Sequence, residues 1–449
     1  MRRFRWVALG VAAALGVSVM SATAGAQSTG SEKPKATDVG ITATEIHIAV
    51  IADVDNPIVP NLFKASPDAV KGVANYLNSK AGGGGLAGRK VVVDFYDSKL
   101  NANATTNAEI QACQNDVAMV GTSAVSLSSV DNMRNCADST GAVTGLPDIP
   151  FVSTALVHQC SDQSFPIAPP QVLCTTKDAH PQTFRANVSR GLFYNQKFGK
   201  GKLHGVYVFG NDSKSARDSS FVSLGALRDI GIKSDKDFDV SGFAPQSAYT
   251  PVIQEMKNSG SNYGQAITAS AMVLMRKEAT LQGLNTVKVW DCGVGCYDKQ
   301  FLSNGGSDVE GQYVDTLFLP FYSKADQKAN AMTGNFVKYT GADKVASFGA
   351  YAWAAGIAFR DAVNAAVKAN GVNGVTRKTI FEELNKIHKF DAEGMFAPID
   401  LAGRGISQCS TTMQVKNGQF VRVSPTKAGT FKCWPNGIVT RKLDIFTGS

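Results

Sequence analysis

Short apolar runs alternate with amphipathic stretches through the first third of the chain, and this alternation constrains the fold more than any other feature. The segment EIHIAVIAD (45–53) alternates and then runs apolar, as a buried strand does. Ser66-Pro67-Asp68 provides a helix start, and the glycine-rich segment 81–88 ends that helix. Further strands are predicted at 90–98, 117–121 and 149–154, and further helices at 103–114 and 129–138. This order predicts a parallel sheet covered by helices on both faces.

The alternation starts again after an insert at 160–174, which contains proline and is bracketed by cysteines. Strands are predicted at 203–210, 237–243, 263–269 and 286–292, and helices at 183–200, 215–231, 248–260 and 271–283. A third block holds an apolar helix at 348–370 and a hairpin turn signal, KNGQ, at 416–419. We therefore predict an α/β fold of two doubly wound parallel-sheet lobes. The pattern alone leaves the lobe membership of the third block open.

The N-terminus has the pattern of a secretory signal. Arg2, Arg3 and Arg5 precede an apolar run, and small residues at 24–26 supply a cleavage site. We predict a signal peptide at 1–26 and a flexible, polar leader at 27–40, with a membrane anchor as the alternative. No cysteine follows the apolar run, which argues against a lipid anchor at this site. The mature chain is then exported to the periplasm or cell surface.

Composition excludes some classes of partner. Cleavage after Ala26 removes three of the basic residues and takes the formal net charge from +8 to +5. The remaining basic residues are scattered, so nucleic acid is not an expected partner. No later stretch is long and apolar enough to predict a transmembrane helix.

All eight cysteines follow the signal, and an even number in an exported chain predicts disulfides. Pairing sequence neighbours gives the simplest set, which is Cys113–Cys136, Cys160–Cys174, Cys292–Cys296 and Cys409–Cys433. A zinc site is the alternative for Cys292 and Cys296. It would need a second close Cys or His pair, and none of the five histidines has that spacing. We expect no metal and no cofactor.

Small polar residues collect where the predicted strands end. These strand ends run into 53–57, 121–129, 153–156, 210–215, 268–271 and 291–298. In open α/β sheets the crevice beyond the carboxyl ends of the strands is where ligands bind. Ordinary turn and capping residues are the alternative at any single position, but the recurrence in both lobes predicts a shared binding cleft.

The order of several motifs resembles a type 1 periplasmic-binding protein of the branched-chain amino-acid-binding group, the receptors of ABC transporters. The motifs include GITATEIHIAVIAD, GRKVVVDFYDS, QTFRANVS, VYVFGND and FGAYAWAAGIAF, and they span most of the mature sequence. The resemblance implies two lobes joined by a three-strand hinge that crosses near Arg185, Tyr313 and Phe390. Lobe one would then be 41–184 with 314–389, and lobe two 185–313 with 390–449.

The resemblance also implies where a ligand is held. Hydroxyls and backbone N–H groups of two lobe-one loops would bind a carboxylate, which places Ser123, Ser126, Ser153, Thr154 and Ala155 in the site. In such proteins an acidic residue of the second lobe usually binds the ammonium group of the ligand. Cys292 stands at its position here, and Asp291 lies one residue earlier. A tyrosine of the fourth loop is also missing, and Ala216 or Arg217 stands in its place. We predict that Cys292–Cys296 staples a cleft-lining loop.

These departures widen the set of predicted ligands from amino acids to amides and organic or aromatic acids. Arg217 is predicted to pair with a carboxylate, and Tyr297 or Phe63 to supply an apolar wall. The complete set of predicted ligand-binding residues is Asp55, Phe63, Ser123, Ser126, Ser153, Thr154, Ala155, Asp212, Arg217, Ser270, Asp291 and Tyr297.

Two other functions are weighed against a binding protein. A hydrolase would need a carboxylate pair, for which Asp53, Asp55, Asp212 and Asp291 are candidates. A sensor subunit would use the same fold to control a membrane partner. We favour a monomeric, non-enzymatic receptor that binds a small molecule reversibly and delivers it to the permease and ATPase of an ABC importer.

Overall fold

The computed structural model describes residues 32–57, 59–210, 214–266 and 268–445, so the predicted signal peptide lies outside the described residues. The chain from Lys33 onward forms one compact unit. Within the described part of the chain, none of the helices is both long and apolar enough to cross a membrane.

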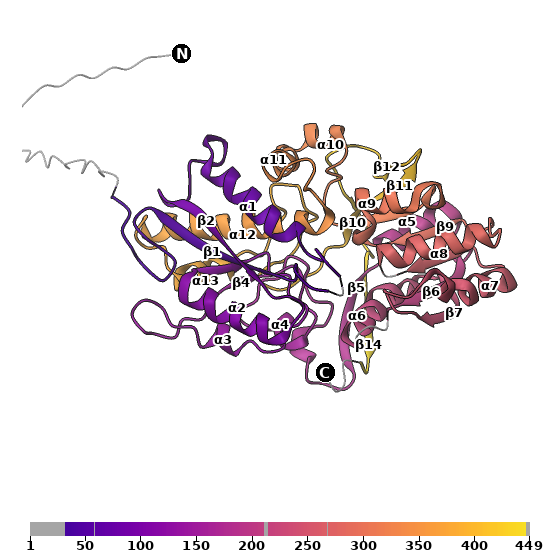
Figure 1. Cartoon of the computed structure of the whole chain (residues 1–449), viewed down its shortest axis with the longest axis horizontal. Helices are drawn as coiled ribbons and strands as arrows, with labels where there is room; N and C mark the ends of the chain where they lie inside the picture. The colour runs from indigo at the N-terminus through magenta and orange to yellow at the C-terminus, as the bar shows by residue number, and fades with distance from the viewer. Residues whose placement is uncertain (1–31, 58, 211–213, 267, 446–449) are drawn as a thin grey trace, which may run out of the picture. The chain divides into compact units, whose positions relative to one another are not determined.

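The first sheet is parallel and has the strand order β2-β1-β3-β4. Strands β1, β2 and β4 are labelled in Figure 1. Its strands are β1 (Glu45–Ala52), β2 (Lys90–Asp97), β3 (Ala118–Val120) and β4 (Asp148–Ile149). Ile48 and Val50 of β1 share one apolar core with α1 (Ala65–Asn78) and α12 (Ser347–Asn370). Ala49 and Ile51 face a second core with α2 (Ala102–Asn115) and α3 (Asp131–Arg134). Burial on both faces explains why this strand is a continuous apolar run.

Glycines allow α1 and α12 to pack closely. A Cβ on Gly356 of α12 would lie 2.3 Å from Cγ1 of Val73 on α1. A Cβ on Gly72 would likewise lie 2.5 Å from Oγ1 of Thr340, in α11 (Ala331–Thr340). Helix α13 (Arg377–Leu384) packs on α12 and completes this layer.

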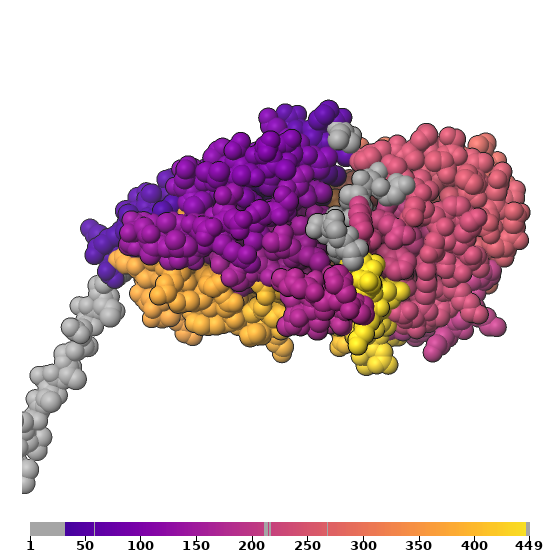
Figure 2. Space-filling view, turned by 90° about the horizontal axis from the view of Figure 1, so that it is seen from below, coloured from indigo at the N-terminus to yellow at the C-terminus, as the bar shows by residue number. Residues whose placement is uncertain are grey.

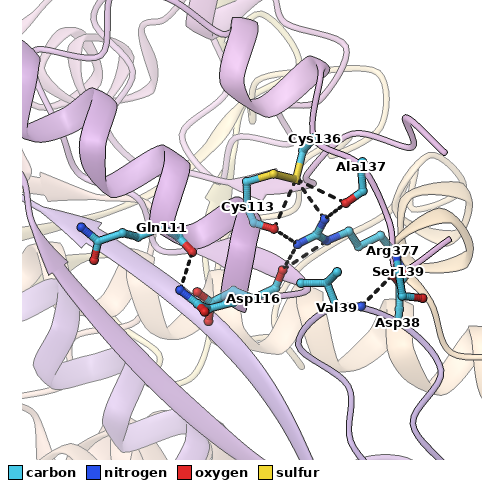
Figure 3. The surroundings of a disulfide bond; sticks show 10 residues. Asp38, Val39, Gln111, Cys113, Asp116, Cys136, Ala137, Ser139 and Arg377 are labelled. Carbon is cyan, nitrogen blue, oxygen red and sulfur yellow. Dashed lines mark hydrogen bonds between the residues drawn. A yellow bond between two sulfur atoms is a disulfide. The ribbon is translucent and has the colours of Figure 1, made fainter. Parts of the chain in front are cut away.

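Arg377 of α13 ties three segments together at the end of α2 (Figure 3). Its guanidinium is fully buried and donates to the backbone carbonyls of Cys113, Asp116 and Ala137, beside the Cys113–Cys136 disulfide. A cation at the last carbonyls of a helix is favourable because those carbonyls have no partner within the helix. Burial lowers the pKa of Arg377.

The second sheet has the order β12-β11-β10-β9-β8-β6-β7. Its parallel strands are β6 (His204–Phe209), β7 (Lys233–Asp239), β8 (Tyr263–Ala266), β9 (Val289–Cys292) and β10 (Tyr313–Thr316). The antiparallel hairpin β11 (Cys409–Lys416) and β12 (Gln419–Ser424) extends it, and β13 (Lys432–Cys433) pairs with β11. The hairpin predicted at KNGQ is confirmed, and Asn417 and Gly418 have φ angles of 52° and 67°.

Helices and short turns connect the strands of the second sheet. They are α5 (Ser189–Phe198), α6 (Lys214–Gly225), α7 (Thr250–Ser259), α8 (Ala269–Leu281) and α9 (Lys299–Gly305), followed by α10 (Lys324–Ala329). We call the four-stranded sheet with α1, α2, α3, α12 and α13 the first unit, and the sheet from β6 to β12 with α5 to α9 the second unit. The chain passes between these two units three times, between β4 and β6, between β10 and α12, and between α13 and β11.

A third, two-stranded sheet pairs β5 (Gln182–Asn187) with β14 (Ile438–Leu443). Figure 2 shows the C-terminal segment that carries β14, in yellow, beside the magenta segment that contains β5. The helix predicted over 183–200 is therefore wrong at its start, because residues 182–187 form a strand whose partner lies about 250 residues further along the chain. The helix begins at Ser189.

Other sequence predictions need smaller corrections. The strand predicted at 237–243 is β7, which begins earlier and has mostly exposed side chains, and the helix predicted at 129–138 is limited to α3. The flexible leader predicted over 27–40 is fixed near its end, where Thr37 Oγ1 donates to the carbonyl of Val375 at 2.6 Å and Asp38 accepts from the N–H of Arg377 at 2.8 Å.

All four disulfides join sequence neighbours, as predicted. They are Cys113–Cys136, Cys160–Cys174, Cys292–Cys296 and Cys409–Cys433. In the described part of the chain, no group of three or more His, Cys, Asp or Glu side chains is arranged to hold a metal ion.

Candidate ligand-binding site

Asp53 organises the carboxyl edge of the first sheet, directly after β1. Its side chain is fully buried. Oδ1 accepts from Oγ of Ser98 at 2.6 Å and from the N–H of Leu100 at 2.7 Å, and Oδ2 accepts from the N–H of Val125 at 2.8 Å. One buried carboxylate therefore fixes the loops that follow β2 and β3 against the end of β1, and these donors offset the cost of burying its charge.

The loops after β3 and β4 lie side by side at this edge. Oγ1 of Thr154 donates to the carbonyl of Val125 at 2.9 Å, and a β-bridge joins Ser123 to Val152. Ser126, Ser153, Thr154 and Ala155 are partly exposed, whereas Ser123 is fully buried. Among the described residues, the backbone N–H groups of Ser153, Thr154 and Ala155 have no hydrogen-bond partner. This loop therefore offers neutral donors for the polar end of a ligand.

Three phenylalanine rings gather beside the same loops. Phe63 lies edge-on to Phe151 and Phe348, with ring centroids 5.8 and 5.4 Å apart, and Phe151 stacks on Phe348 at 5.7 Å. Tyr351, one turn further along α12, stacks on Phe151 at 5.8 Å. Phe348 is only partly buried, whereas Phe63 and Phe151 are each 6% exposed. We call Phe63, Phe151 and Phe348 the aromatic cluster.

The stapled turn between Cys292 and Cys296 lies against this cluster. Cys292 ends β9, and the 3₁₀ turn η5 (Val294–Cys296) follows it. Both cysteines are buried, and the three residues between them are partly exposed. A Cβ on Gly295 would lie 4.0 Å from Cζ of Phe348, so the turn of the second unit faces a ring of the first. That this turn lines a ligand cleft stays a prediction.

Two predicted site residues of the second unit lie in its interior instead. Asp291 is fully buried and accepts from Nε of Arg190 at 2.9 Å and from the hydroxyls of Tyr194 and Tyr263, each at 2.8 Å. Burial raises the pKa values of both tyrosines, and the negative charge of Asp291 adds to this effect. Both oxygens of Asp291 are already bonded, so the structure gives this residue a structural role.

Tyr297 is also fully buried, and its hydroxyl accepts from the N–H of Tyr322 at 3.1 Å. Its ring packs among Phe318, Phe321 and Phe420, with centroids 4.7 to 5.9 Å away. The predicted apolar wall at this position is therefore part of the core beneath the stapled turn.

The remaining predicted residues lie on other carboxyl-edge loops or outside the described chain. The guanidinium of Arg217 pairs with Asp239, at 3.1 Å between Nε and Oδ1, so it already has a carboxylate partner. Ser270, at the start of α8, and Asp55, on the loop after β1, are both exposed. Asp212 lies outside the described residues.

A carboxyl group in each unit has a strongly raised pKa. Burial raises the pKa of Glu109, on α2, to about 7, and a hydrogen bond from Asn132 partly offsets this effect. Burial also raises the pKa of Asp315, on β10, to about 7, with Arg190 acting in the opposite direction. Neither residue belongs to the loops described above.

The comparisons with known proteins identify the family and the fold. The sequence matches the family described as periplasmic binding protein over residues 45–419. The chain belongs to the periplasmic binding protein family. The predicted type 1 periplasmic-binding fold is confirmed, and members of this family are extracytoplasmic receptors that bind small molecules.

Solved periplasmic binding proteins share the fold at low sequence identity. A leucine-binding protein from Thermotoga maritima is 16% identical, with a TM-score of 0.58, over 84% of this chain and 98% of the other. A branched-chain amino-acid-binding protein from Streptococcus pneumoniae, in complex with isoleucine, is 14% identical, with a TM-score of 0.61, over 85% and 100%. A fatty acid ABC transporter substrate-binding protein from Thermomonospora curvata is 13% identical, with a TM-score of 0.62, over 90% and 99%. No curated protein matches the sequence.

Sequence reasoning missed several residues of this periplasmic binding protein's candidate site. Phe151 lies two residues after the end of β4, so the rule on strand ends could have found it. Asp53 begins the strand-end segment 53–57, but the sequence suggests a role for its side chain only as one of four candidate hydrolytic carboxylates. Phe348 gave no signal, because it opens a helix that is apolar on almost every side.

A cavity of about 250 Å³ lies elsewhere in the second unit. Its lining includes Lys288 and Glu310, which precede β9 and β10, so it lies at the amino ends of these strands. Arg276 lines it as well and stacks on Trp290, with Cζ 5.0 Å from the ring centroid, and burial lowers the pKa of Arg276 to about 10. Because ligands of open α/β sheets bind at the carboxyl ends, we do not assign the main site to this cavity.

Proposed function

We propose that this protein binds a small molecule that combines a polar end with an apolar body, encloses it between its two lobes, and delivers it to an ABC importer. The observation that carries this proposal is the aromatic cluster, which lies beside the unbonded N–H groups of the β4 loop and faces the stapled turn. The proposal includes the lobe boundaries predicted from the sequence, a monomeric state, and a mature chain that begins after Ala26.

The polar end of the ligand fits the loop at 153–155. Backbone N–H groups without an intramolecular partner stabilise a carboxylate or carbonyl oxygen without the burial of a counter-cation. The hydroxyl groups of Ser126 and Ser153 lie on the same pair of loops and are partly exposed. We propose these two serines, Thr154 and Ala155 as the contacts of the polar end.

The apolar body of the ligand fits the aromatic cluster. Phe348 is the ring of the cluster that is least buried, and it also faces Gly295 of the stapled turn. Aromatic rings bury a large apolar area against a ligand with little loss of side-chain freedom. Leucine, isoleucine and fatty acids, which are named for the structural relatives, all pair a carboxylate with an apolar body.

We propose that no bond is made or broken at this site. Asp53 and Asp291, two of the four candidates for a hydrolytic pair, are buried in different units, and each accepts three hydrogen bonds. Neither carboxylate is free to activate water.

A thermal-shift screen of the purified mature protein tests the proposal. The panel contains leucine, isoleucine, phenylalanine, the amides of these amino acids, aromatic acids and medium-chain fatty acids. At least one compound is expected to raise the melting temperature and to be recovered unchanged. A product in the recovered sample would identify an enzyme, and a panel without any stabilising compound would contradict the proposed ligand class.

Two variants locate the site once a ligand is known. Phe348→Ala is expected to weaken binding by about 10- to 150-fold, because a ring that covers the apolar body contributes about 1.5–3 kcal/mol. Phe381→Ala is the matched control, since Phe381 is a partly buried ring on α13 that packs against Phe165. Equal losses of affinity in both variants would argue against the aromatic cluster as the site.

A further inference from the structure

A second buried carboxylate connects the two loops at which the proposed ligand is held. Oγ1 of Thr122 donates to Oδ1 of Asp148 at 2.6 Å, and Nε2 of His158 lies 2.7 Å from Oδ2 of the same carboxylate. All three side chains are fully buried. We call Thr122, Asp148 and His158 the buried triad.

The members of the triad come from three different segments of the first unit. Thr122 lies on the β3 loop, next to Ser123, and Asp148 begins β4. His158 lies on α4 (Leu156–Gln159), which begins directly after the loop at 153–155. The single carboxylate of Asp148 therefore holds the β3 loop through one oxygen and the segment after the β4 loop through the other.

The imidazole of His158 depends on this contact for its orientation. Among the described residues, its Nδ1 is buried and has no hydrogen-bond partner, so Asp148 makes the only polar contact of the ring. A buried carboxylate also needs its donors, because a charge without partners is costly in a protein interior. The two contacts of Asp148 therefore support each other.

We propose that Asp148 is a positioning residue for ligand binding, because it fixes the distance between the β3 loop and the β4 loop through Thr122 and His158. The residue does not touch the ligand. This inference rests on the proposed function, since the two loops carry the proposed polar contacts at Ser126 and at 153–155. It parallels the role of Asp53, which fixes the β2 and β3 loops from the other side.

Thr122→Val tests one arm of the triad and keeps the volume of the side chain. Hydrogen exchange of the backbone amides is measured first, without ligand. We expect faster exchange at 121–126 and 152–159 in the folded variant, and Thr122→Ser is expected to restore the exchange of the natural protein. Affinity is measured next, and Thr122→Val is expected to weaken the ligand found in the screen by about tenfold.

Thr250→Val is the matched control, because it removes the same kind of bond at a different place. Oγ1 of Thr250 donates to Oε1 of Glu278 at 2.8 Å in the second unit. This variant is expected to leave both the exchange at 121–126 and 152–159 and the affinity unchanged. Measuring it separates a general loss of stability from a change at the loops.

The two measurements also separate this inference from the proposed function. Unchanged exchange in Thr122→Val would overturn the inference, even if the ligand binds the natural protein. Faster exchange with unchanged affinity would overturn it too, because the loops would then move without an effect on the ligand. If no compound binds the natural protein, the proposed function fails, and the positioning role fails with it.

Discussion

Replacing Cys292 and Cys296 together by alanine tests whether the stapled turn takes part in ligand binding. Both sulfurs are buried, so alanine avoids the burial of an unbonded hydroxyl that serine would cause. The disulfide closes a loop with a sequence separation of 4. In the chain-entropy treatment, releasing a loop of this length costs about 2 kcal/mol of stability at 25 °C.

The same free energy sets an upper bound on the loss of affinity. In the natural protein the turn is already ordered against Phe348, whereas in the variant the ligand has to order it on binding. A cost of about 2 kcal/mol corresponds to a dissociation constant that rises by up to about 30-fold. Isothermal titration calorimetry measures this change, and urea unfolding measures the loss of stability.

The Cys113–Cys136 disulfide provides the control. Its sequence separation is 23, so its removal is expected to cost about 3 kcal/mol, more than the loss of the staple. The pair lies at the end of α2, near the amino end of β3, and we expect its removal to leave the affinity unchanged. If the staple variant binds as tightly as the natural protein, or if the control loses as much affinity, the turn does not contribute to the site.

Further predictions concern buried groups and export. Burial raises the pKa of Glu109 from 4.5 to about 7, so the folded state holds this proton more tightly than the unfolded chain, and stability is lost as the pH rises through 7. Glu109→Gln is therefore expected to gain up to about 3 kcal/mol over the natural protein between pH 4 and pH 8, and an equal difference in urea unfolding at both pH values would refute this. Burial raises the pKa of Asp116 to about 8, and Asp116→Asn is expected to stabilise the protein with the same sign, most strongly at pH 8 and above. Gly356→Ala is expected to lower the stability by about 1–3 kcal/mol in the same assay, because the added methyl group would overlap Val73. Mass spectrometry of the exported protein is expected to give a chain that begins at Gln27, and a mass that includes residues 1–26 would indicate a retained anchor.

The alternation of strands and helices is a local property, which is why the two layered units could be predicted from the sequence. Strand β5 shows the limit of this reasoning. Its partner β14 lies far away in the sequence, and local periodicity carries no information about such a pairing. The disulfides could be predicted because their pairing is local. Each joins cysteines at most 24 residues apart in the sequence.

The candidate site was predicted in part. Strand ends mark the loops, and the resemblance to periplasmic-binding proteins selects Ser126, Ser153 and Thr154 on them, which stay predicted contacts. The direction of a side chain at a strand end is harder to predict, because a strand buried on both faces has no polar side that fixes the alternation. Asp291 illustrates this, since it lies in the fully buried strand β9 and faces the tyrosines of the interior.

The carboxylates of this protein also bear on the ligand that it selects. Three buried carboxylates are Asp53, Asp148 and Asp291. Their oxygens already form hydrogen bonds with residues of their own unit. What the loops beside the aromatic cluster offer to a ligand is a set of neutral N–H donors, hydroxyls and rings. Binding by neutral dipoles and apolar area changes little with ionic strength, whereas an exposed ion pair weakens as salt is added. A dissociation constant that stays nearly constant between low and high salt therefore follows from this arrangement, and a steep rise would indicate that an exposed charge such as Asp55 holds the ligand.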